Sequence, residues 1–111
     1  MTIYKTAMSG IPVTLQEEAT TGNGIAIAIP SSFRKHALYI RGLDAPSAGA
    51  VWPETADSPA DSVWAKIPAS AITVIDGEVV YNFEGIYLAL RARISTNIVS
   101  GSVTVEYIGS H

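Results

Sequence analysis

Hydrophobic and polar residues alternate along most of this chain. The clearest run places Leu88, Leu90, Ala92 and Ile94 on one side of an extended backbone, and a period of two is the pattern of a half-buried β-strand. The alternation recurs along the sequence and predicts eight or nine short strands, at 12–18, 24–30, 36–42, 48–52, 63–67, 71–75, 78–84, 87–95 and 102–108.

Turn-forming residues separate these runs. Asp76-Gly77 lies between 71–75 and 78–84 and predicts a tight β-hairpin. Proline cannot donate to a β-ladder, so Pro53 is expected in a loop or at a strand end. The long stretch Gly42–Ser62 is therefore expected to be irregular, apart from the short strand at 48–52. Irregular segments of this length in a small domain often carry function.

The pattern predicts an all-β protein with a single domain, an antiparallel β-sandwich of jelly-roll or other Greek-key topology, with a barrel as the alternative. The length of 111 residues fits one domain. Residues 13–111 are expected to form the sandwich. Residues 1–12 are expected to be either an apolar arm that orders on a neighbouring subunit or an ordinary edge strand, and they hold Ile3, Tyr4, Met8 and Ile11.

Composition narrows the function. The chain has no cysteine, which excludes disulfide scaffolds and thiolate metal sites. Charged residues make up only 15%, and the net charge of −3 argues against a nucleic-acid partner, which needs clustered lysine and arginine. The longest aliphatic run, 24–30, is too short to span a membrane. Residues 1–10 lack the apolar segment of a secretory signal.

No catalytic constellation emerges from the sequence, so we expect a protein that is not an enzyme and has no cofactor. His36 follows Arg34 and Lys35, and we interpret it as a surface histidine. Acidic residues gather between positions 44 and 61, where calcium is an alternative to a solvated loop, but the alternating ligand spacing of a calcium loop is missing. These residues are Asp44, Glu54, Asp57 and Asp61.

Aromatic and basic residues suggest two kinds of contact surface. Trp52 and Trp64 flank the acidic stretch and are candidate sugar platforms, although alternation favours Trp64 as a core residue and leaves Trp52 freer. Arg91 and Arg93 share one strand face. They are expected either to form cross-strand pairs with Glu84 and Glu106 or to lie in an oligomer interface.

From about Thr14 to Gly109 the chain resembles small virion structural proteins of tailed bacteriophages. The resemblance rests on an order of segments, which begins with the Thr-Gly-Asn-Gly turn at 21–24 and the alternating isoleucine strand. The later segments are Leu-Tyr-Ile-Arg-Gly at 38–42, Ser-Ala-Gly-Ala-Val at 47–51, Glu-Thr-Ala-Asp at 54–57, Val-Trp-Ala-Lys-Ile at 63–67, Tyr-Asn-Phe-Glu-Gly at 81–85, residues 88–95 and residues 101–107.

The resemblance implies a non-catalytic virion protein, assembled in the host cytoplasm, that binds the major capsid protein or other virion subunits. Capsid decoration is the favoured role, and a tail or neck protein or a carbohydrate-binding module are the alternatives. We expect a closed cyclic homo-oligomer, with a trimer favoured. The expected interface residues are Ile3, Tyr4, Met8, Ile11, Trp52, Glu54, Asp57, Arg91 and Arg93.

Overall fold

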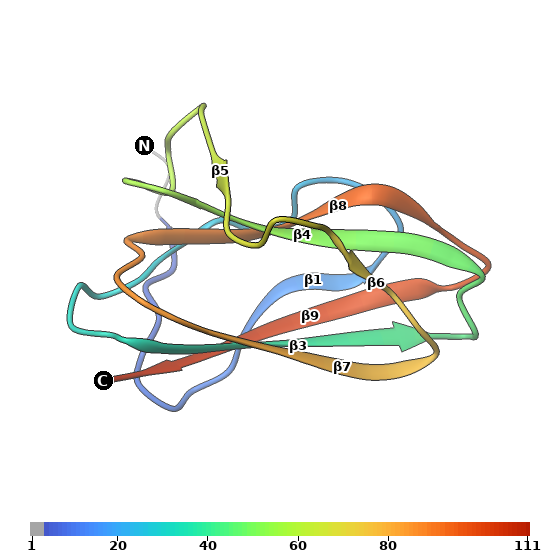
Figure 1. The fold of residues 1–111 in the computed structure, drawn as a ribbon, viewed down its shortest axis with the longest axis horizontal. Coiled ribbons are helices and arrows are strands. Elements are labelled where there is room, and N and C mark those ends of the chain that lie inside the picture. Colours follow the sequence, from blue (N-terminus) through green and yellow to red (C-terminus); the bar gives the residue numbers. More distant parts are fainter. Residues whose placement is uncertain (1–3) are drawn as a thin grey trace.

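Two antiparallel β-sheets pack face to face in the computed structural model, which describes residues 4–111 (Figure 1). The prediction of an all-β sandwich is confirmed. No helix long and apolar enough to cross a membrane occurs in the part of the chain that the structure describes. The strands are β1 (Val13–Ala19), β2 (Ile27–Ala28), β3 (Lys35–Leu43), β4 (Ala48–Ala56), β5 (Ala65–Lys66), β6 (Ile72–Thr73), β7 (Gly77–Glu84), β8 (Ala89–Val99) and β9 (Ser102–Ser110).

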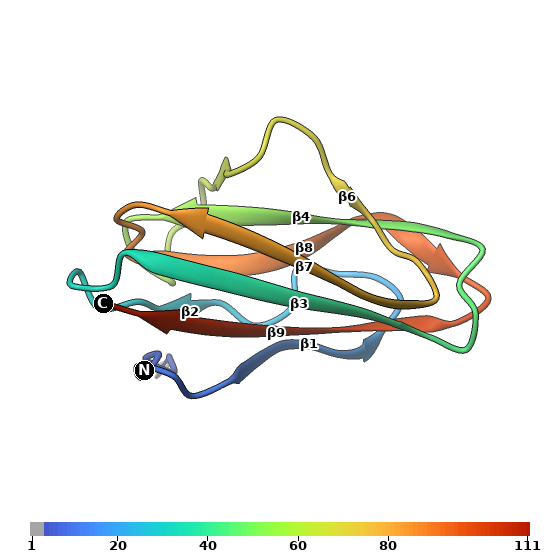
Figure 2. The same cartoon turned by 60° about the horizontal axis from the view of Figure 1, so that its bottom comes forward.

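The strand order is that of a jelly roll. One sheet, called here the β9 sheet, has the order β1-β9-β3-β7. The other, the β8 sheet, has the order β2-β8-β4-β5, and β6 also pairs with β4. Apart from the connections that join β4, β5 and β6, every connection crosses from one sheet to the other (Figure 2). If β5 and β6 are counted as one position beside β4, each sheet has four positions, as in a double Greek key.

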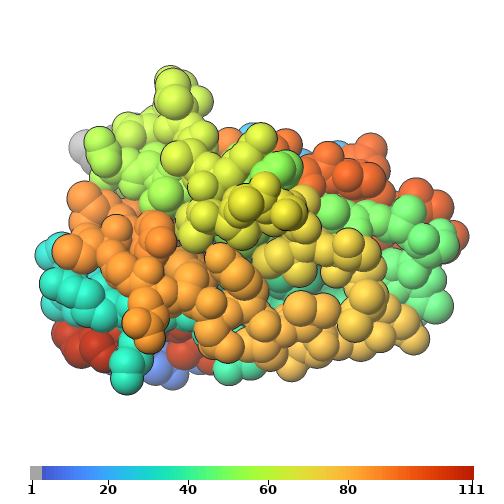
Figure 3. Space-filling model, in the orientation of Figure 1, coloured from blue at the N-terminus to red at the C-terminus, as the bar shows by residue number. Residues whose placement is uncertain are grey.

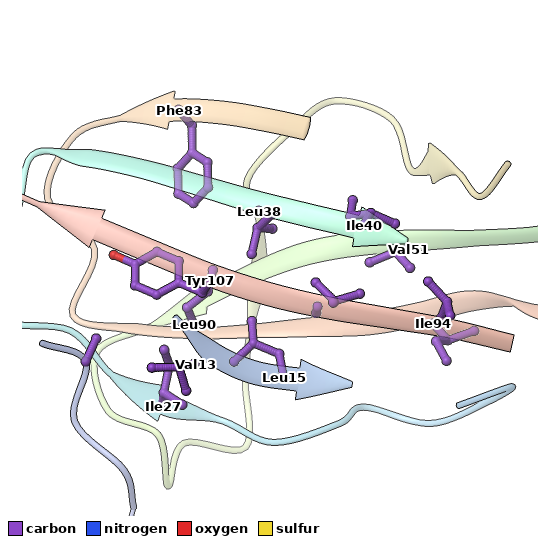
Figure 4. Close-up of a cluster of buried hydrophobic side chains, with 14 of the residues drawn as sticks. Val13, Leu15, Ile27, Leu38, Ile40, Val51, Phe83, Leu90, Ile94 and Tyr107 are labelled. Carbon is purple, nitrogen blue, oxygen red and sulfur yellow. The ribbon is translucent and has the colours of Figure 1, made fainter. Parts of the chain in front are cut away.

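Alternation in the sequence places the core between the sheets. Leu38 and Ile40 of β3 face Val51 and Leu90 of the β8 sheet, and all four side chains are almost fully buried (Figure 4). Tyr107 of β9 is the largest side chain with no exposed surface. Successive side chains of a strand point to opposite faces of the sheet. The apolar residues at every second position therefore all face the space between the sheets and form one continuous hydrophobic core.

The predicted hairpin at Asp76-Gly77 is wrong. β6 pairs with β4 in the β8 sheet, whereas β7 pairs with β3 in the β9 sheet. Gly77 does take a positive φ of 107°, as a turn requires, but the turn carries the chain from one sheet to the other. Val74 is buried just before it, and its N–H donates to the carbonyl of Gly49 in β4.

The expectation that Pro53 ends a strand is also wrong, because β4 continues through it to Ala56. Pro53 lies opposite Ala92 of β8. Its carbonyl accepts from Ile67 on the other side of the strand, at 3.0 Å. The N and C=O of one residue point the same way in an antiparallel strand, so the missing N–H of Pro53 faces the gap between β5 and β6. The ladder to β8 loses no donor.

The chain before β1 runs beside the edge of the β8 sheet. The Ala7 N–H donates to the Ala28 carbonyl and the Ala28 N–H donates to the Lys5 carbonyl, both at 2.9 Å. This is a parallel bridge to β2, and Ala7 is buried. Gly10 then donates to Gly109 of β9, so the segment passes from one sheet to the other.

Candidate functional site

A groove of about 580 Å³ opens at one end of the sandwich. It lies between the segment that follows β4 and the connection from β7 to β8, which stand out at the left of Figure 3 in yellow-green and orange. The end of β4 and the start of β5 contribute only small residues. The lining residues are Thr55, Ala56, Asp57, Asp61, Val63, Trp64, Ala65, Ile86, Tyr87 and Leu88.

One side of the groove is fixed to the core through His36. The His36 ring is only 3% exposed, so the expectation of a surface histidine is wrong. Its Nε2 lies 2.9 Å from the Gly85 carbonyl and its Nδ1 lies 2.6 Å from the Tyr107 hydroxyl. A carbonyl can only accept, so Nε2 carries the proton and Nδ1 accepts from Tyr107.

This arrangement holds a neutral imidazole. Burial lowers the pKa of His36, and the bond to the Gly85 carbonyl opposes that shift only in part. Burial also raises the pKa of the Tyr107 hydroxyl. The Tyr87 ring packs edge-on against His36 at 5.4 Å and against Phe83 at 5.3 Å. The segment 85–88 is thereby tied to the interior immediately beside the groove.

The other side of the groove is fixed through Trp64. Its indole N–H donates to the Asp61 carbonyl at 2.7 Å, and the Arg91 guanidinium lies 4.5 Å from the ring centre. Trp64 is half-buried on the outer face of the β8 sheet, so its expected place in the core is wrong. The cause is that β5 has only two residues and packs beside β4.

Glu54 lies behind Trp64 and is buried, contrary to the expectation of a solvated loop carboxylate. It receives hydrogen bonds from Nε of Arg91 at 2.8 Å and from Nε of Arg93 at 3.0 Å. The predicted partners of these arginines, Glu84 and Glu106, lie on strands of the other sheet. Three charges on two neighbouring strands therefore form one cross-strand cluster.

Trp52 is less free than the sequence indicated. Its indole N–H donates to the Pro68 carbonyl at 3.0 Å, and the Lys66 ammonium lies 4.1 Å from the ring centre. Both contacts come from the chain that follows β4, which covers this part of the outer face of the β8 sheet. Trp52 therefore helps to hold that covering segment and does not line the groove.

The charge inside the groove is entirely negative. Asp57 and Asp61 are its only charged side chains. Neither takes part in an ion pair within residues 4–111. No group of three or more histidine, aspartate or glutamate side chains is placed to hold a metal ion in that range.

The expected interface residues do not form one surface, and Trp52 lies apart from the groove, under residues 66–68. Asp57 lines the groove. Glu54, Arg91 and Arg93 form the ion-pair cluster that contacts Trp64 through Arg91. Tyr4, Met8 and Ile11 are exposed along the segment before β1, and Ile3 lies outside the described residues. Val63 and Ile86 carry no signal in the sequence that marks them as site residues, and Leu88 was expected on the buried face of its strand, yet all three are exposed around the groove. In the sequence, Leu88 continues the alternation of the buried residues Leu90, Ala92 and Ile94. It lies one residue before β8 begins, however, and it is exposed.

Comparison with known proteins gives one informative structure. No protein-family model matches the chain. No curated protein matches it either. The fold is similar to the crystal structure of the SPBc2 prophage-derived protein YomS, with a TM-score of 0.62 over 90% of this chain and 92% of that chain. Sequence identity is 13%, so the likeness establishes the jelly-roll fold and nothing beyond it.

Proposed function

We propose that this chain is a non-catalytic structural protein of a phage virion, and specifically a capsid decoration protein that binds and stabilises the head shell. The observation that carries the proposal is the fold shared with a prophage-derived protein along nearly the whole length of both chains. The segment order that resembles small virion proteins of tailed bacteriophages supports it independently.

The surface supports a binding role. Jelly rolls serve in viral capsids and in lectins, so the fold leaves the function to the surface. Here exposed aliphatic side chains surround a concave site. One side is tied to the core through Gly85 and His36, and the other is held against the outer face of the β8 sheet by the contact of Trp64 with Arg91. Such a rigid apolar site with a polar rim suits a protein partner.

The proposed partner is the major capsid protein, and the proposed location is the virion. Copies placed around a symmetric capsid position would form a closed cyclic oligomer, and a trimer remains the favoured state. Many weak contacts would then add through avidity. A tail or neck location is the alternative within the same class of function.

The number of copies per particle tests this proposal. Particles of the source phage are purified, and peptides of this chain are quantified by mass spectrometry against peptides of the major capsid protein. A simple ratio with hundreds of copies is expected for a decoration protein. A handful of copies would move the chain to the tail or neck. Complete absence would overturn the virion proposal.

One observation favours carbohydrate binding as a second candidate function. Trp64 presents an aromatic surface beside the carboxylates of Asp57 and Asp61, which can accept hydrogen bonds from sugar hydroxyls. Soluble glycans would then change tryptophan fluorescence, and Trp64→Ala would abolish the change while Trp52→Ala would preserve it. Fluorescence that stays constant across a glycan panel would remove this candidate.

A further inference from the structure

Three exposed aliphatic side chains gather in the groove. Val63 is 82% exposed, Ile86 59% and Leu88 40%, and all three line the same concavity. Scattered apolar side chains are normal on a protein surface, but a cluster around a concave site marks a place where another molecule binds. Aliphatic side chains favour the apolar side chains of a protein over the hydroxyl-rich surface of a sugar.

The charge of the groove adds a second requirement. Arg91 contacts the groove residue Trp64, but neither Arg91 nor Arg93 lines the groove, and the two arginines share Glu54 in a cluster with a net charge of +1. Asp57 and Asp61 give the groove lining a charge of −2, which exceeds the +1 of the neighbouring cluster. A partner with lysine or arginine side chains at matching positions would complement it.

The form of the groove adds a requirement on shape. Residues Asp61, Val63 and Trp64 line one side and Ile86, Tyr87 and Leu88 line the other. Between them the end of β4 and the start of β5 contribute the small side chains of Ala56 and Ala65. A space of about 580 Å³ between two such sides suits a single extended segment better than a second folded surface.

We infer that the groove binds an extended segment of a neighbouring virion subunit that alternates apolar and basic side chains. The apolar side chains would contact Val63, Ile86 and Leu88, and the basic ones would pair with Asp57 and Asp61. This inference deepens the proposed function, because it names the contact surface and the chemistry of the partner segment.

A library of random dodecapeptides tests the inference without any phage particle. The library is selected against the immobilised full chain, and the enriched peptides are synthesised and titrated by fluorescence anisotropy. We expect peptides that combine lysine or arginine with aliphatic residues. We also expect their amide chemical-shift changes to fall at 55–65 and 85–89. Acidic peptides, shift changes elsewhere, or no enrichment at all would overturn the inference.

Three variants make the test specific. The double variant Asp57→Lys/Asp61→Lys should raise the Kd of a selected basic peptide about tenfold or more, because two attractions become repulsions. Ile86→Ser should raise it by about tenfold through lost apolar contact. Glu17→Lys/Glu78→Lys, which places the same charge change of +4 on exposed positions of the β9 sheet, is the matched control and should leave the Kd within about twofold. Equal Kd values for all three variants would contradict the inference.

A particle assay separates failure here from failure of the proposed function. Particles lacking this chain are incubated with wild-type protein or with Asp57→Lys/Asp61→Lys. Loss of particle binding in the double variant alone supports both proposals. Equal binding by both proteins would overturn the groove as the contact surface and leave the virion role standing. Absence of binding by the wild type would contradict the virion role, whatever the peptides do.

Discussion

The two sheets carry the same cross-strand chemistry on their outer faces, in different surroundings. On the β8 sheet, Arg91 lies 2.8 Å from Glu54, and on the β9 sheet Arg41 lies 2.8 Å from Glu78. The Glu54 side chain is 5% exposed, whereas that of Glu78 is 36% exposed. The shortest distance is the same, so the clusters differ in burial and in which charge is shared: Arg91 and Arg93 share Glu54, whereas Glu78 and Glu106 share Arg41.

The difference arises from the segment between β4 and β7. It arches over the outer face of β4 in Figure 2 and places Trp64 against Arg91. Within residues 4–111 no comparable segment covers Arg41 and Glu78 of the β9 sheet, and both side chains are exposed. A solvated pair contributes little to stability, whereas breaking a buried pair leaves an uncompensated charge. The covered cluster of Glu54, Arg91 and Arg93 therefore stabilises the side of the groove that contains Trp64. The exposed cluster around Arg41 is expected to contribute little to stability.

Replacing the two glutamates separately tests this contrast and has the largest expected effect. Glu54→Gln should lower the free energy of unfolding by about 2–3 kcal/mol, because Arg91 and Arg93 lose their shared partner. Glu78→Gln should cost less than about 0.5 kcal/mol. Urea denaturation followed by circular dichroism measures both. Equal losses would show that burial does not distinguish the clusters.

The hydrogen bond between Tyr107 and His36 is a buried polar contact in the interior that involves no ion pair. Tyr107→Phe removes the hydroxyl that donates to His36 Nδ1 and leaves a buried acceptor without its partner. We expect a loss of about 1–2 kcal/mol, between the values for Glu54→Gln and Glu78→Gln. Tyr39→Phe on the half-buried outer face of β3 is the matched control for removing a tyrosine hydroxyl. A loss below that of the control would contradict the assigned hydrogen bond.

Lowering the pH should weaken the same contact. The folded pKa of His36 lies below the ordinary value of 6.5, so the unfolded chain takes up the proton first as the pH falls. The contribution of His36 is therefore complete above pH 6.5 and is lost below it, down to the folded pKa. An NMR titration of the His36 ring should give a midpoint below 6.5. A midpoint above 6.5 would contradict the neutral ring.

Salt gives the smallest expected effect and separates the two clusters once more. Raising NaCl from about 0.1 to 0.5 M should reduce the coupling between Arg41 and Glu78, measured by a double-mutant cycle, by a few tenths of a kcal/mol. The coupling between Arg91 and Glu54 should change less, because water and ions reach it poorly. A stronger salt dependence at Glu54 would reverse the comparison.

Sequence predicted the parts of the fold that depend on local periodicity. The predicted segments 36–42, 78–84 and 102–108 correspond to β3, β7 and β9 with ends within two residues, because one face of each strand is less exposed than the other. Asp76-Gly77 correctly predicted a turn, but it did not predict that the chain leaves one sheet there and enters the other. Turn residues fix a local bend, whereas the choice of sheet depends on the distant strands β3 and β4.

The site was harder to predict because its contacts are distant in sequence. Glu54 stands among Pro53, Asp57 and Asp61 and looks solvated until β8 brings two arginines beside it, 37 and 39 positions away. His36 follows two basic residues, yet its partners Gly85 and Tyr107 are 49 and 71 positions away. Periodicity carries no information about such pairs.

Binding of the purified chain to particles that lack it tests the central claim most directly. Increasing amounts are added to particles from a deletion strain, and bound copies are counted after sedimentation. The account predicts saturation at a fixed ratio to the major capsid protein, together with a rise in the temperature at which heads rupture. Binding that never saturates, or no binding, would contradict a decoration role.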